Sequence, residues 1–158
     1  MPAKKSPLTS SLTIAALLLA SGLASAEVSR YEEPIHYRRA VMTMIKRHYT
    51  QIYNMANGKI PMNRDELNRH ANYLEMLSRA SLDGFVAGSH EGDTRAKPEI
   101  WTEWARFRSL NDKFVADAVR LKEAAKSNNA DALKTVANDM TRTCKNCHDD
   151  FRSTPVGQ

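Results

Sequence analysis

The stretch Cys144-Lys145-Asn146-Cys147-His148 ends ten residues before the C-terminus of the 158-residue chain. On a helix, Cys144 and Cys147 share one face, and His148 lies beside them, one turn after Cys144. The C-x-x-C-H spacing is that of c-type haem attachment, in which two thiols add to the porphyrin vinyl groups and the imidazole reaches the iron. The sequence therefore predicts one covalent haem c, held by Cys144 and Cys147, with His148 as the proximal iron ligand.

The same five residues could instead form a redox-active dithiol or half of a zinc site. A zinc site usually needs four Cys or His ligands at metal-site spacing, and both cysteines of the chain already lie in this one motif. A thioredoxin-like dithiol would follow a strand in a βαβ pattern, and no such pattern is present. Haem attachment is therefore favoured, and it leaves no thiol for a structural disulfide.

Residues 1–26 have the pattern of a secretory signal peptide. Lys4 and Lys5 form a positive start, an apolar run follows, and Ala-Ser-Ala at 24–26 is a cleavage sequence. The apolar run, roughly a dozen residues, is short for a membrane span, although a retained anchor is the alternative. We expect a mature domain of residues 27–158 with no stable membrane insertion after cleavage. Because bacteria attach haem c outside the cytoplasm, we expect the protein in the periplasm.

Length and charge limit the classes of function. A chain of 158 residues has room for one domain. Removing Lys4 and Lys5 with the leader leaves 21 basic against 18 acidic residues, a net charge of +3. Two haem propionates would offset most of this charge, and no basic run or stripe stands out. A nucleic-acid or lipid-surface role therefore has no support.

After the leader, apolar residues recur at helical spacing, without a sustained period of two. Asn63 with Glu66 three residues later is a capping-box pattern, Pro98 suits a first helical turn, and Gly58 suits the position after a helix. The predicted helices cover residues 34–57, 63–82, 98–126 and 130–153. The link 84–97 is long and the other two links are short. Short links make neighbouring helices antiparallel, so the predicted fold class is all-α, an antiparallel up-down four-helix bundle.

Each predicted helix carries an apolar stripe. The expected inward residues are Ile35, Arg38, Met42, Ile45, Tyr49, Ile52 and Met55; Leu67, Ala71, Leu74, Leu77 and Ser81 or Leu82; Ile100, Trp101, Trp104, Phe107, Phe114, Ala118 and Leu121; and Leu133, Val136 or Ala137, Met140, Cys144, Cys147 and Phe151. The haem cysteines fall on the inward face of the last helix. The pattern therefore predicts a haem inside the bundle.

The second axial position of the iron can hold His, Met or nothing. Met42 is the leading candidate because it lies in the middle of the first inward stripe, although a methionine can equally be core filler. Met44 lies about 200° around the helix from it. His36 and His48 each lie well off its direction, which disfavours a bis-histidine site. His70 and His90 have the pattern of surface residues.

The chain resembles the class II cytochromes c, the cytochrome c′ family, over essentially its whole mature length. The resemblance is carried by Tyr-Arg-Arg-Ala-Val-Met at 37–42, Gly-Lys at 58–59, Pro-Glu-Ile-Trp at 98–101 and Cys-Lys-Asn-Cys-His-Asp-Asp-Phe-Arg at 144–152. It implies a four-helix bundle with haem c between the helices and His148 as the solvent-side ligand. It further implies Arg38 near a haem propionate and Arg152 beside the proximal pocket. One departure is that many relatives have Phe-Pro near residues 83–88.

The resemblance implies two possible functions, which differ in the role of the residue at the position of Met42. In low-spin members a first-helix methionine binds the iron and the protein carries electrons. In high-spin members the iron is five-coordinate and binds NO or CO. Because the residue here is methionine, we expect a low-spin, periplasmic, single-haem electron carrier. The alternative is a high-spin protein with Met42 as a lid.

A peroxidase-like protein is a weaker possibility, because the first stripe offers Arg38 but no clear histidine as distal acid or base. We therefore expect no enzyme in the ordinary sense. The expected partners are redox proteins, whose identity the sequence does not give. A second copy of the chain is a further candidate partner. Relatives often dimerise through their first two helices, and Met44, Tyr53 and Tyr73 lie off the core stripes there.

Overall fold

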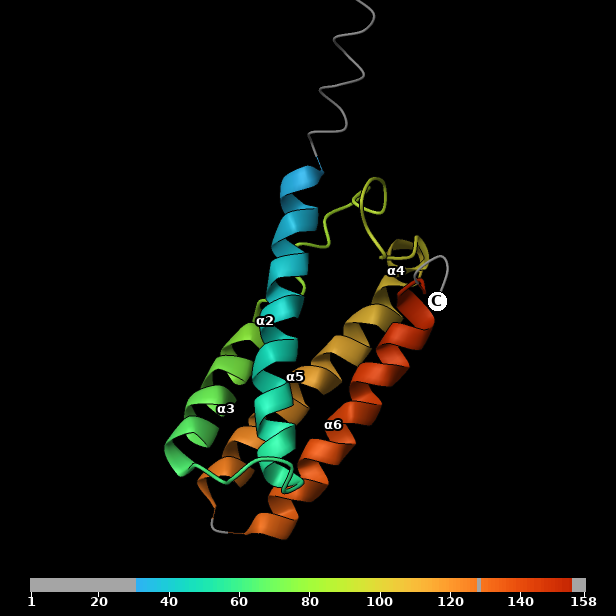
Figure 1. Ribbon diagram of the computed structural model, residues 1–158. Coiled ribbons are helices and arrows are strands. Elements are labelled where there is room, and N and C mark those ends of the chain that lie inside the picture. The colour runs from blue at the N-terminus through green and yellow to red at the C-terminus, as the bar shows by residue number, and fades with distance from the viewer. Residues whose placement is uncertain (1–30, 128, 155–158) are drawn as a thin grey trace, which may run out of the picture.

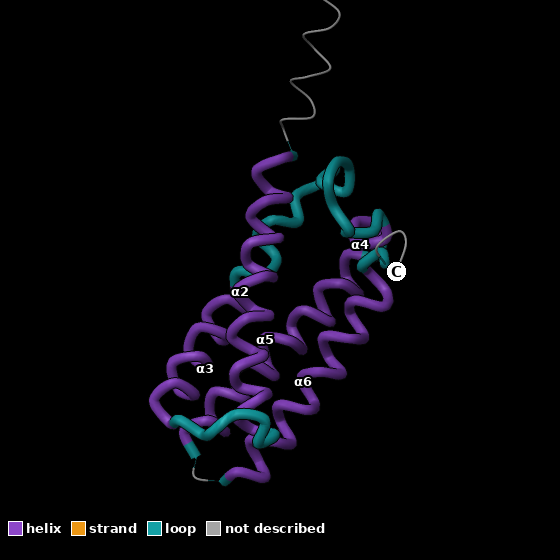
Figure 2. Tube along the Cα trace, viewed as in Figure 1, coloured by secondary structure: helices purple, strands orange, loops and turns teal. Residues whose placement is uncertain are grey.

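The computed structural model describes residues 31–127 and 129–154. Within them lie five helices: α2 (Glu32–Ala56), α3 (Arg64–Arg79), α4 (Glu99–Thr102), α5 (Trp104–Lys126) and α6 (Ala130–Phe151). The four long helices form the bundle in Figures 1 and 2, in which α2 packs against α3 and α6, and α5 packs against α3 and α6. The predicted all-α four-helix bundle is confirmed. The predicted signal peptide lies outside the described residues.

The ends of the helices follow local signals in the sequence. The side chain of Asn63 accepts hydrogen bonds from the backbone N–H groups of Asp65 and Glu66, both at 3.1 Å, which confirms it as the N-cap. The carboxylate of Glu66 pairs with Arg69 rather than completing a capping box. At the end of α2, Gly58 has φ +68°, and the N–H of Lys59 bonds to Asn54 O at 2.8 Å. This is a Schellman ending built on glycine.

The third predicted helix is not continuous. Helix α4 ends at Thr102, and α5 begins at Trp104 after Glu103, whose φ of −114° and ψ of 36° are not helical. The hydroxyl of Thr102 donates to Glu99 O at 3.3 Å, so a side chain competes with the backbone for this carbonyl. Trp104 is consequently 38% exposed rather than inward as predicted.

The apolar interior has two parts. The main cluster joins the four long helices, and its buried members are Val41, Ile45, Ile52, Met55, Leu67, Ala71, Leu74, Leu77, Ala118, Leu121, Ala125, Leu133, Ala137 and Met140. A smaller cluster of Ile100, Phe107 and Phe151 lies at the end of α6, with Phe85 and Trp101 packed against it. Cys144 packs against the main cluster and Cys147 against the smaller one. The two cysteines therefore lie where the two clusters meet.

The connection between α3 and α4 crosses α2 and reaches the end of α6. Near its start it passes so close to α2 that a Cβ on Gly84 would lie 2.7 Å from Pro34 O. Near its end, Lys97 N–H donates to Phe151 O at 3.1 Å and Ser153 N–H donates to Arg95 O at 2.9 Å. The connection therefore links α2 to the C-terminal end of α6. It begins after Arg79, where α3 ends, rather than after residue 82 as predicted.

None of the helices in residues 31–127 and 129–154 combines the length and the apolar composition needed to cross a membrane.

Candidate haem site

The two cysteines of the motif are half-buried free thiols on α6. Burial, together with the charge of Asp117, raises the pKa of the Cys144 thiol to about 11. Burial and the charges of Cys144 and Asp150 raise that of Cys147 to about 11. Both sulfur atoms therefore lie as neutral thiols at the edge of the apolar clusters. Two such thiols at i and i+3 fit the paired vinyl groups of a haem.

His148 lies at the C-terminal end of α6 and is exposed overall. Even so, desolvation by the surrounding protein is the main cause that lowers the pKa of its imidazole, and the positive charges of Arg152 and Arg95 lower it further. A lowered pKa keeps the imidazole neutral, which is the form that binds a metal. His148 thus has the chemistry that the proximal position requires.

Met42 lies on α2 at the level of the haem motif. The hydroxyl of Tyr49 shares a hydrogen bond of 2.5 Å with Thr141 Oγ1, which sets the register of α2 against α6. The two helices run antiparallel in Figure 1. Met42 lies seven residues before Tyr49 and His148 lies seven residues after Thr141, so both lie two turns, roughly 10 Å, further along in the same direction. Met42 is half-buried and packs against the same cluster as Cys144.

Arg38 is buried, with 4% of its surface exposed. Its guanidinium donates to Gly84 O at 3.1 Å, to both oxygens of Ser89, and to Thr94 Oγ1 at 2.6 Å. Burial lowers its pKa. In the part of the chain that the structure describes, its hydrogen-bond partners are neutral oxygens. A buried charge usually has a counter-charge, and a haem propionate is a group of the right sign.

Arg152 follows α6 directly and is exposed. Its backbone N–H donates to His148 O at 3.1 Å. Burial, then the charge of Arg95, lowers the pKa of its guanidinium. Arg152 and Arg95 thus form a positive neighbourhood beside His148.

The prediction of a surface position is wrong for one histidine and holds only in part for another. His70 is largely buried rather than on the surface, with a side chain that is 12% exposed. Its Nδ1 lies 2.8 Å from Nδ1 of His48 on α2. His90 is half-buried and its ring lies 5.2 Å from the ring of Trp101. The reason in both cases is a partner on another element, which helical spacing does not reveal.

Three polar residues near the motif were not predicted from the sequence. Asp117 on α5 is 2% exposed, and its position between Phe114 and Leu121 on the inward stripe was a signal that could have found it. Lys97 Nζ donates to the carbonyl oxygens of Asp149 and Asp150 at 3.1 and 2.9 Å, at the end of α6. Arg95 holds Ser153 O through its Nε at 2.8 Å. The two basic residues come from the irregular connection, where no spacing rule applies.

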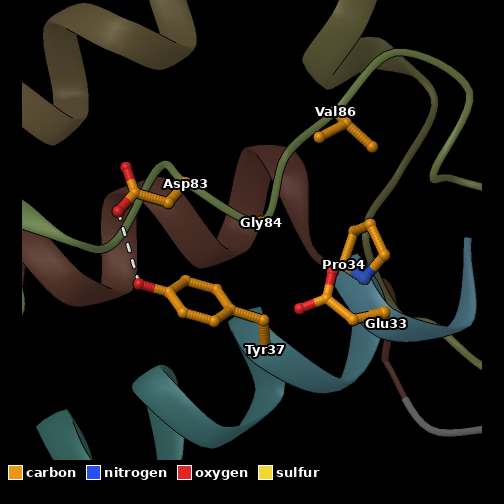
Figure 3. Close-up of a pocket in the computed structure, with 6 residues that line it drawn as sticks. All are labelled: Glu33, Pro34, Tyr37, Asp83, Gly84 and Val86. Atoms are coloured by element: carbon orange, nitrogen blue, oxygen red, sulfur yellow. Dashed lines mark hydrogen bonds between the residues drawn. The ribbon is translucent and has the colours of Figure 1, made fainter.

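Two open hollows flank the N-terminal half of α2. Figure 3 shows the first, of about 260 Å³, where the hydroxyl of Tyr37 points toward the carboxylate of Asp83 at 3.3 Å. The second, of about 520 Å³, is lined by His36, Arg39, Ala40 and Asp93. Neither lining includes a residue of the haem motif, so neither hollow defines the site.

Comparison with known proteins identifies the family. A family model described as Cytochrome C′ matches residues 33–152. Cytochrome c′ of Rubrivivax gelatinosus is 31% identical over 121 residues, which is 76% of this chain and 94% of that protein. The structure of cytochrome c prime from Shewanella frigidimarina has a TM-score of 0.77 and 31% identity, covering 79% of this chain and 98% of that one.

The chain belongs to the cytochrome c′ family. Its cofactor is haem c, covalently bound, and its two cysteines are the available attachment points, as predicted. A further similar structure is the nitric oxide complex of a variant of cytochrome c prime from Alcaligenes xylosoxidans. It has a TM-score of 0.73 and 27% identity, covering 78% of this chain and 96% of that one.

Proposed function

We propose that this protein is a high-spin haem c protein whose five-coordinate iron binds NO or CO on the face that Met42 covers. The observation that carries the proposal is the similarity to a family structure that is a nitric oxide complex. It favours the alternative left open by the sequence over the expected low-spin electron carrier. Bound haem supplies an iron that can take up a small gas or exchange one electron.

In this proposal each residue of the site has a distinct role. Cys144 and Cys147 hold the macrocycle against the two apolar clusters, and His148 binds the iron from the solvent side. Arg38 neutralises a propionate, while Arg152 lies beside the proximal imidazole. The half-buried Met42 side chain, level with the motif across from α6, excludes water and bulky ligands from the other face.

A low-spin electron carrier is the second candidate. It is favoured by one observation, the presence of a methionine at the level of the motif, because a thioether is an iron ligand in His/Met cytochromes. Its partners would be electron-donor and electron-acceptor proteins. A peroxidase-like activity has less support, since a distal acid or base is needed and His48 is turned toward His70 on α3.

The spin state of the purified ferric holoprotein tests the proposal. We expect a high-spin absorption spectrum, binding of NO and CO by the ferrous form, and an unchanged ferric spin state in Met42→Ala. Removing the lid should speed CO binding in that variant. Met44→Ala is the matched control, because Met44 is 44% exposed. A low-spin wild-type spectrum that becomes high-spin in Met42→Ala would overturn the proposal in favour of the second candidate.

Location and assembly are further parts of the proposal. We infer export to the periplasm with cleavage after Ala26, and intact mass of the exported protein checks the cleavage site. A second copy of the chain could pack on α2 and α3, where Met44 and Tyr73 are 44% and 43% exposed. Tyr53, half-buried beside Lys59, is less available. Light scattering distinguishes monomer from dimer.

A further inference from the structure

Asp117 is a buried carboxylate in the middle of α5, with 2% of its surface exposed. Its Oδ2 accepts hydrogen bonds from Thr143 Oγ1 at 2.6 Å and from Lys113 Nζ at 2.9 Å. Its Oδ1 accepts from Arg120 Nη1 at 3.1 Å. Burial alone would raise the pKa of this carboxyl, but the hydrogen bonds from Thr143 and Lys113 and the neighbouring cations outweigh burial and lower it. Asp117 is therefore ionised in the folded protein.

The carboxylate is close to the haem attachment point. Thr143, which is itself buried with 4% exposure, directly precedes Cys144 on α6. The Asp117–Thr143 bond thus joins α5 to the turn of α6 that carries the first haem cysteine. The negative charge of Asp117 also acts on Cys144, because it helps to keep that thiol protonated. Any group bonded to this sulfur atom lies in the same field.

The cations that pair with Asp117 offset only part of the negative electrostatic potential that its carboxylate creates in the protein interior. The side chains of Lys113 and Arg120 are 55% and 52% exposed, whereas that of Asp117 is 3% exposed. Water screens exposed charges much more than buried ones. Arg120 is also shared with Asp139 at 3.4 Å. The group nearest to the interior is therefore negative.

We propose that Asp117 is a positioning residue of the haem site, whose hydrogen bond to Thr143 orients the turn bearing Cys144 and whose buried negative charge lowers the reduction potential of the haem. This inference rests on the proposed haem attachment. A nearby negative charge stabilises ferric haem, which has one more positive charge than ferrous haem. Neither the motif nor the comparisons assign a role to this residue.

A redox titration of the intact holoprotein with soluble mediators, which supply the electron, tests the inference. Asp117→Asn keeps an acceptor for Thr143 and removes the charge. At the wild-type midpoint potential we expect the ferrous-to-ferric ratio to rise roughly three- to tenfold, the effect of one unit charge on a nearby site at an effective dielectric of about 20. Lys113→Met should shift the ratio the opposite way, because it removes a cation from the same carboxylate.

Two control variants distinguish the electrostatic effect of the Asp117 charge on the ferrous-to-ferric ratio from a structural effect of the substitution. Asp139→Asn removes a carboxylate from the outer part of the cluster, where its side chain is 30% exposed, and should leave the ratio unchanged within twofold. Thr143→Val removes the hydrogen bond but keeps the charge, so it should lower the melting temperature without raising the ratio. An unchanged ratio in both Asp117→Asn and Lys113→Met would overturn the inference. Absence of covalent haem from the wild-type protein would instead refute the proposed function.

Discussion

At the scale of single residues, Gly84 shows how a missing side chain positions a whole connection. Its backbone lies against α2, and a Cβ there would be 2.7 Å from Pro34 O and 2.8 Å from Arg38 Cβ. Arg38 then holds the following residues through Ser89 and Thr94. From the sequence, Gly84 is predicted only as the first residue of the long link, because the close approach involves residues about 50 positions earlier.

We therefore predict that Gly84→Ala destabilises the holoprotein by about 2–3 kcal/mol, the cost of overpacking against backbone that cannot move away. The free energy of unfolding in urea measures it. Gly58→Ala is the comparison, because Gly58 has φ +68° with open space around its Cα. It should cost only about 1 kcal/mol, from backbone conformation alone. Equal losses in the two variants would contradict the close-contact explanation.

For Arg38, the helical spacing of the sequence predicts the direction of the side chain but not its hydrogen-bond partners. Its place on the inward stripe predicted a side chain beside the core, and it is buried as that stripe indicates. Its partners, Gly84, Ser89 and Thr94, lie on the long connection. Periodicity describes one helix face and carries no information about which loop covers it.

At the scale of elements, the helix ends that carry a local capping residue were the most predictable features. Asn63 before α3 and Gly58 after α2 act through their immediate neighbours, so the local sequence was sufficient at these two ends. The break between α4 and α5 and the path of the long connection were not predicted. The break involves the hydroxyl of Thr102 on Glu99 O, which the spacing of apolar residues does not show. The path of the long connection depends on contacts between distant segments, such as the pairing of Ala96 with Arg152.

The C-terminal end of α6 depends on this pairing. Lys97 Nζ binds two of its last carbonyl oxygens, and a cation at this end also interacts favourably with the helix dipole. We predict that Lys97→Met, which keeps most of the aliphatic chain, destabilises the holoprotein by about 0.5–1.5 kcal/mol. Amide hydrogen exchange should speed up at residues 148–152 and remain unchanged at residues 133–140.

Lys145→Met is the matched control for this prediction. Lys145 is also near the end of α6, but its side chain is 70% exposed and, within the described part of the chain, its ion pair is with the exposed side chain of Asp149. Exposed ion pairs contribute little, so this variant should unfold at nearly the wild-type urea concentration. If Lys145→Met frays the helix as much as Lys97→Met does, capping by Lys97 is not the cause.

At the scale of the whole molecule, the dependence of stability on pH involves a pair of histidines that joins α2 to α3. Burial, followed by the charges of His70, Arg47 and Arg69, lowers the pKa of His48 on α2. Burial is also the main cause that lowers the pKa of His70 on α3, with Arg69 and Arg47 adding to it and Glu66 opposing it. The unfolded chain, with ordinary imidazoles, therefore binds protons at a higher pH than the folded protein does.

The sign of the pH dependence follows from linkage. The free energy of unfolding should not depend on these two groups well above the ordinary imidazole pKa of about 6.5. It should fall as the pH drops from there toward the lowered folded-state values. We predict a smaller loss between about pH 7.5 and pH 5.5 in the His48→Gln, His70→Gln double variant, measured by urea unfolding of the holoprotein. His36→Gln, which changes an exposed histidine, should behave as the wild type.

The fold class was predictable from sequence because four apolar stripes and three links describe a bundle almost completely. The motif likewise located the cofactor. The opposite face of the haem was not predictable, because a methionine has the same pattern whether it binds iron or fills space. Asp117 was not predicted to be buried because only apolar residues were used to define the inward face of its helix. Thr143, which donates a hydrogen bond to its carboxylate, lies on another helix.

The division of the interior into two unequal clusters has a consequence for how such a protein can evolve. The large cluster, away from the C-terminal end of α6, provides most of the buried apolar surface and keeps the bundle folded. Met42 and the haem motif lie at its border. If Met42 covers the iron as proposed, a substitution there would change access to the iron while leaving the buried members of the large cluster in place. The proposed gas binder and the alternative electron carrier would then differ at the border of the large cluster and share its buried interior.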